Sequence, residues 1–159
     1  YTECQVERRN IVTIVEYIDK SISDSLKLAA ASGVDVRVMI PGKGDHIFVY
    51  WANLVYAGEL LEFGVKIYHY DKNAFLHAKT VVIDDEICSV GTANMDIRSF
   101  YLNYEVNAIC YGREEVKKMC DIFEKDRWNC REFTYQEYAS RSLKIRIKEH
   151  ISRLLSPLL

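Results

Sequence analysis

The chain has 159 residues, 49% of them hydrophobic and 28% charged, which is enough apolar surface for one packed core and excludes a disordered protein. Its formal net charge of −2 is unevenly spread, because residues 141–159 carry five Arg or Lys residues against one acid, Glu149. An acidic body argues against a broad nucleic-acid surface, and the basic end indicates an anionic partner such as a membrane.

Predicted strands and helices alternate along the chain, which is typical of an α/β fold. The first predicted helix is expected to begin at Ser21 or Ser23 and to end at Gly33. In chain order, the predicted elements are a strand at 11–18, a helix at 22–32, a strand at 34–40, a helix at 47–62, a strand at 65–70, a hairpin of 77–83 and 86–91 turning at Asp84-Asp85, a strand at 103–111, a helix at 113–130, and a helical tail opened by a capping box at 134–137.

The segment from His77 to Asp84 has the form H-x-K-x4-D. Side chains two residues apart share one face of a strand, so His77 and Lys79 are expected to point into one pocket. A neutral imidazole beside a fixed ammonium suits attack on a phosphodiester. The imidazole would be the nucleophile, and the ammonium would hold a non-bridging phosphate oxygen.

Three polar residues further along the chain fit the same pocket. Thr92 and Asn94 are again two apart, and a hydroxyl and an amide can donate to phosphate oxygens without adding charge. Glu105 is expected inside the apolar strand 103–111, where a carboxylate needs a partner. An imidazole N–H is the partner that would also orient His77 and raise its basicity.

The run HAKTVVIDDEICSVGTANMDIRSFYLNYEVNAICY (77–111) resembles the second catalytic motif region of bacterial cardiolipin synthases, which belong to the phospholipase D superfamily. Residues 33–46 and the ending SRLLSPLL are similar to other parts of these enzymes, so the resemblance covers about 19–159. The segment GTANMDIRS, followed by LNYE, favours the lipid-synthesising branch over the superfamily's nucleases.

The resemblance implies a phospholipase D-like fold, with a mixed β-sheet flanked by helices, that forms one half of a two-motif pseudodimer. The expected organisation is a divergent N-terminal segment at 1–18 with a possible first strand, a catalytic half-domain at 19–133, and a basic amphipathic helical tail at 134–159.

The resemblance also implies a chemistry and a role for each site residue. A phosphatidyl group would pass from one phosphatidylglycerol to another through a phosphohistidine, with release of glycerol and with no metal or organic cofactor. His77 would be the nucleophile or its acid/base counterpart, Lys79 and Asn94 would bind phosphate, Thr92 would line the same pocket, Glu105 would orient His77, and Asp84 would complete the motif in a structural role, tying the hairpin turn or a partner side chain.

These enzymes pair two H-x-K-x4-D motifs, whereas this chain has one. His46, His69 and His150 lack a Lys two residues on, so each is predicted to be structural or on the surface. The second half is expected from an upstream domain or from a second copy of the chain. Two other functions stay open, a homodimeric phosphodiesterase such as a nuclease and a catalytically incomplete lipid-binding module.

The expected partners are phosphatidylglycerol, an anionic membrane surface and the second motif-bearing half, with no nucleic acid. The tail repeats apolar residues at helical spacing (Leu143, Ile147, Ile151 and Leu154), which predicts either a helix lying in a membrane interface or a helix packed on its own domain. No apolar run approaches the ~20 residues of a bilayer span. The expected location is the bacterial cell membrane, with this segment peripheral or on the cytoplasmic side, as a piece of a longer protein.

Overall fold

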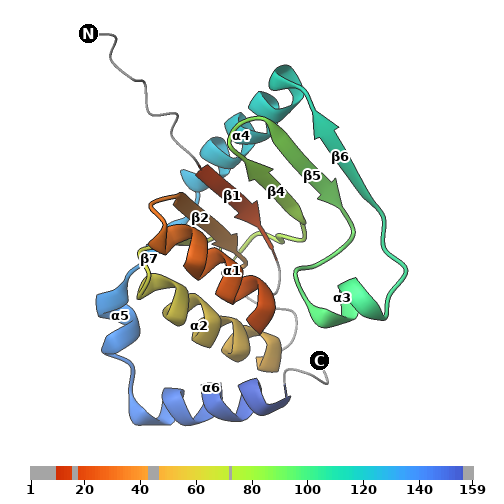
Figure 1. Cartoon of the computed structure of the whole chain (residues 1–159). Helices are drawn as coiled ribbons and strands as arrows, with labels where there is room; N and C mark the ends of the chain where they lie inside the picture. Colours follow the sequence, from red (N-terminus) through yellow and green to blue (C-terminus); the bar gives the residue numbers. More distant parts are fainter. Residues whose placement is uncertain (1–9, 16–17, 43–46, 72, 156–159) are drawn as a thin grey trace, which may run out of the picture.

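The computed structural model describes residues 10–15, 18–42, 47–71 and 73–155. In this part of the chain seven strands form one mixed sheet in the order β6-β5-β4-β1-β2-β3-β7 (Figure 1). The strands are β1 (Asn10–Ile14), β2 (Asp35–Ile40), β3 (Lys66–His69), β4 (Thr80–Ile83), β5 (Ile87–Gly91), β6 (Asn107–Tyr111) and β7 (Arg131–Phe133). The helices are α1 (Lys20–Ala31), α2 (Ile47–Leu61), α3 (Ile97–Tyr101), α4 (Arg113–Arg127), α5 (Tyr135–Ala139) and α6 (Leu143–Leu155).

The strand directions bring the motif segment to one edge of the sheet. β1, β2 and β3 are parallel, so their carboxyl ends lie together. β4 is antiparallel to β1, with Ile14 opposite Thr80, so β4 begins at the same edge. Ligands of open α/β sheets bind beyond the carboxyl ends of parallel strands. The residues just before β4, His77 and Lys79 among them, therefore lie where such a site is expected.

Helices cover both faces of the sheet (Figure 1). Alternate residues of β1 point to opposite faces, so Val15 packs with α1 and α2 while Val12 and Ile14 pack with α4. The core on the α1–α2 side includes Val15, Leu26, Val36, Val38, Leu60 and Ile67, and the core on the α4 side includes Val12, Ile14, Met39, Val82, Val116 and Phe123. The predicted mixed sheet flanked by helices is confirmed.

The capping of α1 differs from the prediction. The N-cap is Asp19, whose side chain accepts a hydrogen bond from the backbone N of Ile22 (2.9 Å). Ser21 was one expected cap, but it lies inside the helix and its hydroxyl donates to Asp19 (2.8 Å). A carboxylate at the N-cap also meets the positive end of the helix dipole. Gly33 follows the helix with φ +87°, as predicted for its end.

Two elements were not predicted, one predicted helix ends early, and the predicted helical tail is divided into α5 and α6. The helix expected at 113–130 ends at Arg127, and residues 131–133 form β7, which pairs antiparallel with β3. α3 is a short helix between β5 and β6, and its residue Phe100 lines the same cavity as Lys79. Both elements are too short to show an apolar period in the sequence.

The C-terminal helices contact α2, and α6 lies along α2 on the side away from α1 (Figure 1). Gly58 of α2 is in close contact with α5, because a Cβ at this position would overlap the ring of Tyr138. Thr134 caps α5 through a hydrogen bond from the backbone N of Glu137 (3.3 Å), as the capping-box pattern predicted. No helix in the described ranges is both long and apolar enough to cross a membrane.

Candidate active site

His77 and Lys79 lie in an extended segment immediately before β4, and not within the strand as expected. They nevertheless meet, because the Lys79 side chain folds back. Its Nζ lies 2.8 Å from Nδ1 of His77 and donates to the His77 backbone carbonyl at 3.0 Å. Lys79 is 6% exposed, whereas His77 is exposed. The ammonium is thus held inside the fold while the imidazole faces outward.

The contact with Lys79 decides where the imidazole carries its proton. An ammonium has N–H donors and no acceptor, so it donates to Nδ1, and the proton of the neutral ring then lies on Nε2. The ring stacks on Phe75, with centroids 5.5 Å apart and planes at 25°. In this arrangement neither ring nitrogen of His77 has a lone pair ready for attack, because Nδ1 accepts from Lys79 and Nε2 is protonated.

A small cavity of about 140 Å³ is lined in part by Lys79, whereas His77, Thr92 and Glu105 are not among its lining residues. Asn94 lines it, and the Oδ1 of Asn94 is buried and meets no hydrogen-bond donor among the described residues. The volume is several times the ~30 Å³ that one water molecule takes up in the liquid, so it suits a phosphate group and excludes a whole lipid. The cavity is lined by Val15, Lys79, Thr80, Val81, Ser89, Ala93, Asn94, Met95, Phe100 and Asn107.

Glu105 was predicted inside an apolar strand, and this was wrong. It precedes β6, because residues 102–106 form the connection between α3 and β6. Its carboxylate accepts hydrogen bonds from Nδ2 of Asn103 (3.2 Å) and Oγ of Ser99 (3.4 Å). Hydrogen bonding by Thr92 and then by Asn103 holds the pKa of Glu105 below its ordinary value, and the charge of Lys79 acts in the same direction. Glu105 therefore supplies a stable negative charge close to the ammonium.

Thr92 links β5 to the segment that holds Glu105. Its Oγ1 accepts a hydrogen bond from the backbone N of Val106 at 3.0 Å. Among the predicted site residues, the structure thus gathers His77, Lys79, Asn94, Thr92 and Glu105 around one edge of the sheet.

Asp84 lies away from the other predicted site residues. It occupies the β4–β5 turn with φ +53° and accepts a hydrogen bond from the backbone N of Asn10 (2.9 Å). Five extended residues at ~3.3 Å each separate it from Lys79 by roughly 16 Å. This geometry agrees with the expected role of Asp84 in tying the hairpin turn.

Several supporting residues were missed from the sequence. Asp96 caps α3 and accepts a hydrogen bond from the backbone N of Ser99 (2.6 Å), while Oγ of Ser99 accepts one from the backbone N of Asn94 (3.1 Å). Asn107 accepts one from the backbone N of Ala93 (3.2 Å). An Asp three residues before a Ser fits an N-cap, which is the signal that could have located α3. These bonds fix the loop that presents Asn94.

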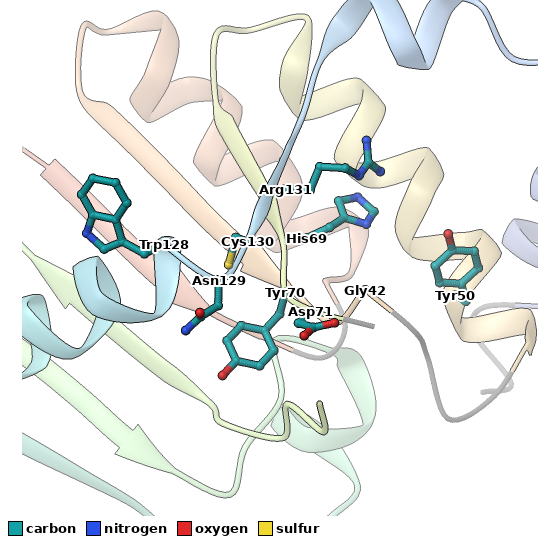
Figure 2. Close-up of a pocket in the computed structure, with 9 residues that line it drawn as sticks. All are labelled: Gly42, Tyr50, His69, Tyr70, Asp71, Trp128, Asn129, Cys130 and Arg131. Atoms are coloured by element: carbon teal, nitrogen blue, oxygen red, sulfur yellow. The ribbon is translucent and has the colours of Figure 1, made fainter. Parts of the chain in front are cut away.

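A second cavity, of about 560 Å³, lies at the carboxyl end of β3 (Figure 2). His69 lines it at 5% exposure and makes an edge-on contact with Phe133 at 4.9 Å. Burial, followed by the charge of Arg131, lowers the pKa of His69 to about 4. His69 is therefore a buried neutral histidine, as predicted for a structural one. His46 and the side chain of His150 lie outside the described residues. The cavity is lined by Gly42, Tyr50, His69, Tyr70, Asp71, Trp128, Asn129, Cys130 and Arg131.

The low pKa of His69 predicts a pH-dependent stability. The unfolded chain takes up the proton near pH 6.5, whereas the folded chain does so only near pH 4, so folding stability is complete above pH 6.5 and falls as the pH drops to 4. We expect a loss on the order of 3 kcal/mol, since each tenfold change in proton affinity is ~1.4 kcal/mol. The loss is measured by urea unfolding of wild type and of His69→Gln at pH values from 7 down to 4, in steps of about one pH unit. Parallel pH curves for the two proteins would refute it.

Comparison with known proteins shows that the chain is similar to cardiolipin synthases in sequence. A family model described as the PLD-like domain of cardiolipin synthase matches residues 4–128. The chain is 54% identical to the major cardiolipin synthase of Bacillus subtilis (strain 168) over 154 residues, which is 96% of this chain and 32% of that protein. It is 58% identical to the cardiolipin synthase of Listeria monocytogenes (serotype 4a, strain HCC23) over 141 residues, which is 89% of this chain and 29% of that protein. The chain thus spans about a third of the length of these curated relatives.

Solved structures show the same fold at low sequence identity. The phospholipase D family member Nuc from Salmonella typhimurium matches with a TM-score of 0.70 at 18% identity, over 80% of this chain and 83% of that chain. The phosphatidylserine synthase of Haemophilus influenzae Rd KW20 matches with a TM-score of 0.74 at 12% identity, over 94% of this chain and 42% of that chain. The predicted phospholipase D-type fold is confirmed.

Proposed function

The chain belongs to the family of cardiolipin synthase PLD-like domains, and from this premise we propose that it is one catalytic half of a phosphatidyltransferase. The whole enzyme would transfer a phosphatidyl group between two phosphatidylglycerol molecules and release glycerol. Within the chain, 19–133 would be the catalytic half-domain and 134–159 the helical tail. The observation that carries the proposal is the buried Lys79, whose ammonium contacts His77 and which lines a phosphate-sized cavity.

The proposed reaction has two displacements at phosphorus. In the first, Nε2 of His77 attacks the donor phosphate, a P–N bond forms, and the P–O bond to glycerol breaks. The leaving glycerol oxygen takes a proton from an acid group of the other half. In the second, the hydroxyl of the acceptor phosphatidylglycerol gives its proton to that group and attacks phosphorus, and the P–N bond breaks. The reaction regenerates His77 and yields cardiolipin and one glycerol.

Lys79 would change partners when the donor phosphate binds. In the structure it donates to Nδ1 of His77, which leaves the ring proton on Nε2. A phosphate oxygen is a stronger acceptor for an ammonium than an imidazole nitrogen is, because it carries charge. Once Lys79 turns to the phosphate, Nδ1 can hold the proton and donate to a carboxylate such as Glu105, which frees the Nε2 lone pair. The side-chain NH2 of Asn94 would donate to a second phosphate oxygen.

An apolar surface beside the site supports pairing with a second half. The segment from α3 to β6 exposes large apolar side chains close to the Lys79 cavity. Monomeric proteins seldom expose a contiguous patch of this kind, which is typical of an interface. We call it the α3 surface, and it comprises Ile97, Phe100, Tyr101, Leu102, Tyr104 and Val106. A partner half seated there would bring its own motif to the cavity.

The coverage of the two solved structures supports a unit that works in pairs. One copy of the fold fills 83% of the Nuc chain but only 42% of the phosphatidylserine synthase chain. The same unit therefore occurs in a chain that one copy nearly fills and in a chain that is long enough for two copies. For this chain the second half would come from an upstream domain or from a second copy, and the site of action would be the bacterial cell membrane, where phosphatidylglycerol lies.

The proposal predicts cardiolipin synthesis without a metal. At high protein concentration, the chain in phosphatidylglycerol–detergent micelles should form cardiolipin and glycerol in equal amounts, and excess chelator should not slow the reaction. Lys79 and Asn94 meet the phosphate charge, and the described residues contain no group of three potential metal ligands. Chromatography of the lipids and an enzymatic glycerol assay measure both products. Release of phosphatidic acid alone, cleavage of DNA in place of lipid, or rescue of a chelated sample by a divalent ion would each refute a part of it.

A further inference from the structure

Helix α6 turns three apolar side chains outward and its acid inward, while Ile145 is half-buried. At about 100° per residue, Leu143, Ile147 and Ile151 form one stripe, and they are 72%, 52% and 51% exposed. The side chain of Leu154, the fourth residue of the predicted stripe, lies outside the described ones. The opposite face contacts α2 and contains Glu149, which is 1% exposed. The tail thus packs on its own domain, which was one of the two predicted possibilities, but through the face opposite to its apolar stripe.

Polar contacts fix this orientation. Nε of Arg141 pairs with Glu149 at 2.9 Å, and both side chains are largely buried. The Arg141 guanidinium also lies over the ring of Tyr138 at 3.2 Å, and Nζ of Lys148 lies over Trp51 at 5.5 Å. Turning the helix to bury the stripe would remove the partner of a buried charge, which is strongly unfavourable. The buried Arg141–Glu149 pair therefore holds the stripe on the outside of the fold.

The charges around the stripe identify what covers it. Lys144 and Arg146 are exposed on its two sides, and Glu149 is the one acid of residues 141–159. An apolar stripe flanked by basic residues and free of acids is complementary to an anionic lipid surface. A protein partner is less well matched, because stable protein interfaces contain ~20–30 residues a side. We propose that the outer face of α6 lies in the interface of an anionic bilayer and docks the chain on it.

This inference rests on the proposed function only in that phosphatidylglycerol is both the substrate and the anionic lipid. The test measures sedimentation of the full chain with phosphatidylcholine vesicles, with and without an equal part of phosphatidylglycerol. Leu143→Gln/Ile147→Gln/Ile151→Gln should weaken binding to the mixed vesicles at least ~10-fold, because the buried apolar area is lost. The control Leu28→Gln/Ile83→Gln/Ile122→Gln changes three exposed aliphatic residues elsewhere and should bind like wild type.

The charge of the helix is tested separately. Lys144→Gln/Arg146→Gln should weaken binding to mixed vesicles at low salt by roughly 25-fold, at about fivefold for each basic side chain, and added salt should reduce the difference. Circular dichroism verifies that all variants fold. In detergent micelles the triple variant Leu143→Gln/Ile147→Gln/Ile151→Gln, the stripe variant, should transfer phosphatidyl at the rate of wild type. If the proposed reaction itself is wrong, both proteins will be inactive in micelles, whatever their binding to vesicles.

Three results would overturn the docking proposal. Wild type could fail to bind the mixed vesicles, or the stripe variant could bind them as well as wild type does. The stripe variant could also change the mass of the protein in light scattering without changing vesicle binding, which would show that another protein chain covers the stripe.

Discussion

Replacing His77 by Ala should lower the rate of cardiolipin formation by at least ~10⁴-fold, because the attacking lone pair is removed and no neighbouring group can replace it. Lys79 donates to the ring of His77 in the structure, and an ammonium has no lone pair for attack. Stability should change little, since His77 is exposed and its aromatic contact is with an exposed Phe75. Lipid chromatography gives the rate, and urea unfolding gives the stability.

A histidine outside the site provides the control. His69→Gln changes a buried imidazole that lines a different cavity, so its rate should stay within ~10-fold of wild type at neutral pH. Near-normal turnover by His77→Ala, with a folded variant, would remove His77 from the mechanism.

Activity of the isolated chain should fall steeply on dilution, because one imidazole cannot both attack phosphorus and protonate the leaving oxygen in the same step. Of the other histidines, none has a Lys two residues on, so in the proposed reaction a second catalytic imidazole would come from another half. A symmetric pair joined through the α3 surface would supply a second His77. Specific activity and light scattering on the same dilution series measure the effect.

Mixing experiments distinguish a shared site from a self-sufficient one. When wild type is mixed with His77→Ala at constant total concentration, the activity should be proportional to the square of the wild-type fraction, since each site needs two intact histidines. Tyr104→Asp, at the centre of the α3 surface, should shift the dilution curve to higher concentration, whereas Leu28→Gln should not. A monomer whose specific activity is independent of concentration would contradict the half-site account.

The sequence predicted the elements whose pattern is local. The strands near 11–18, 34–40 and 65–70 are apolar runs bounded by turn residues, and they correspond to β1, β2 and β3, although β1 begins at Asn10 and ends at Ile14. The Asp84-Asp85 turn is confirmed, because both residues take positive φ between two pairing strands. Such features depend on near neighbours in the chain.

Features that depend on distant contacts were missed. α3 and β7 are held by tertiary packing and are too short for a period. The orientation of α6 is set by the Arg141–Glu149 pair, which overrides the tendency of an apolar stripe to face the core. The contact between Lys79 and His77 is local, and the spacing of these residues predicted that they share a pocket, but it did not predict that Lys79 Nζ lies against the ring of His77.

The most direct measurement of the central claim is a search for phosphatidyl attached to His77. The chain is incubated with phosphatidylglycerol labelled in the phosphate, quenched in base, and digested for mass spectrometry. A P–N bond to imidazole is expected to survive base and to be lost in acid, so the account predicts an acid-labile label on the peptide containing His77, absent from His77→Ala. Consumption of phosphatidylglycerol with no label on the wild-type chain, or a label that persists in His77→Ala, would contradict it.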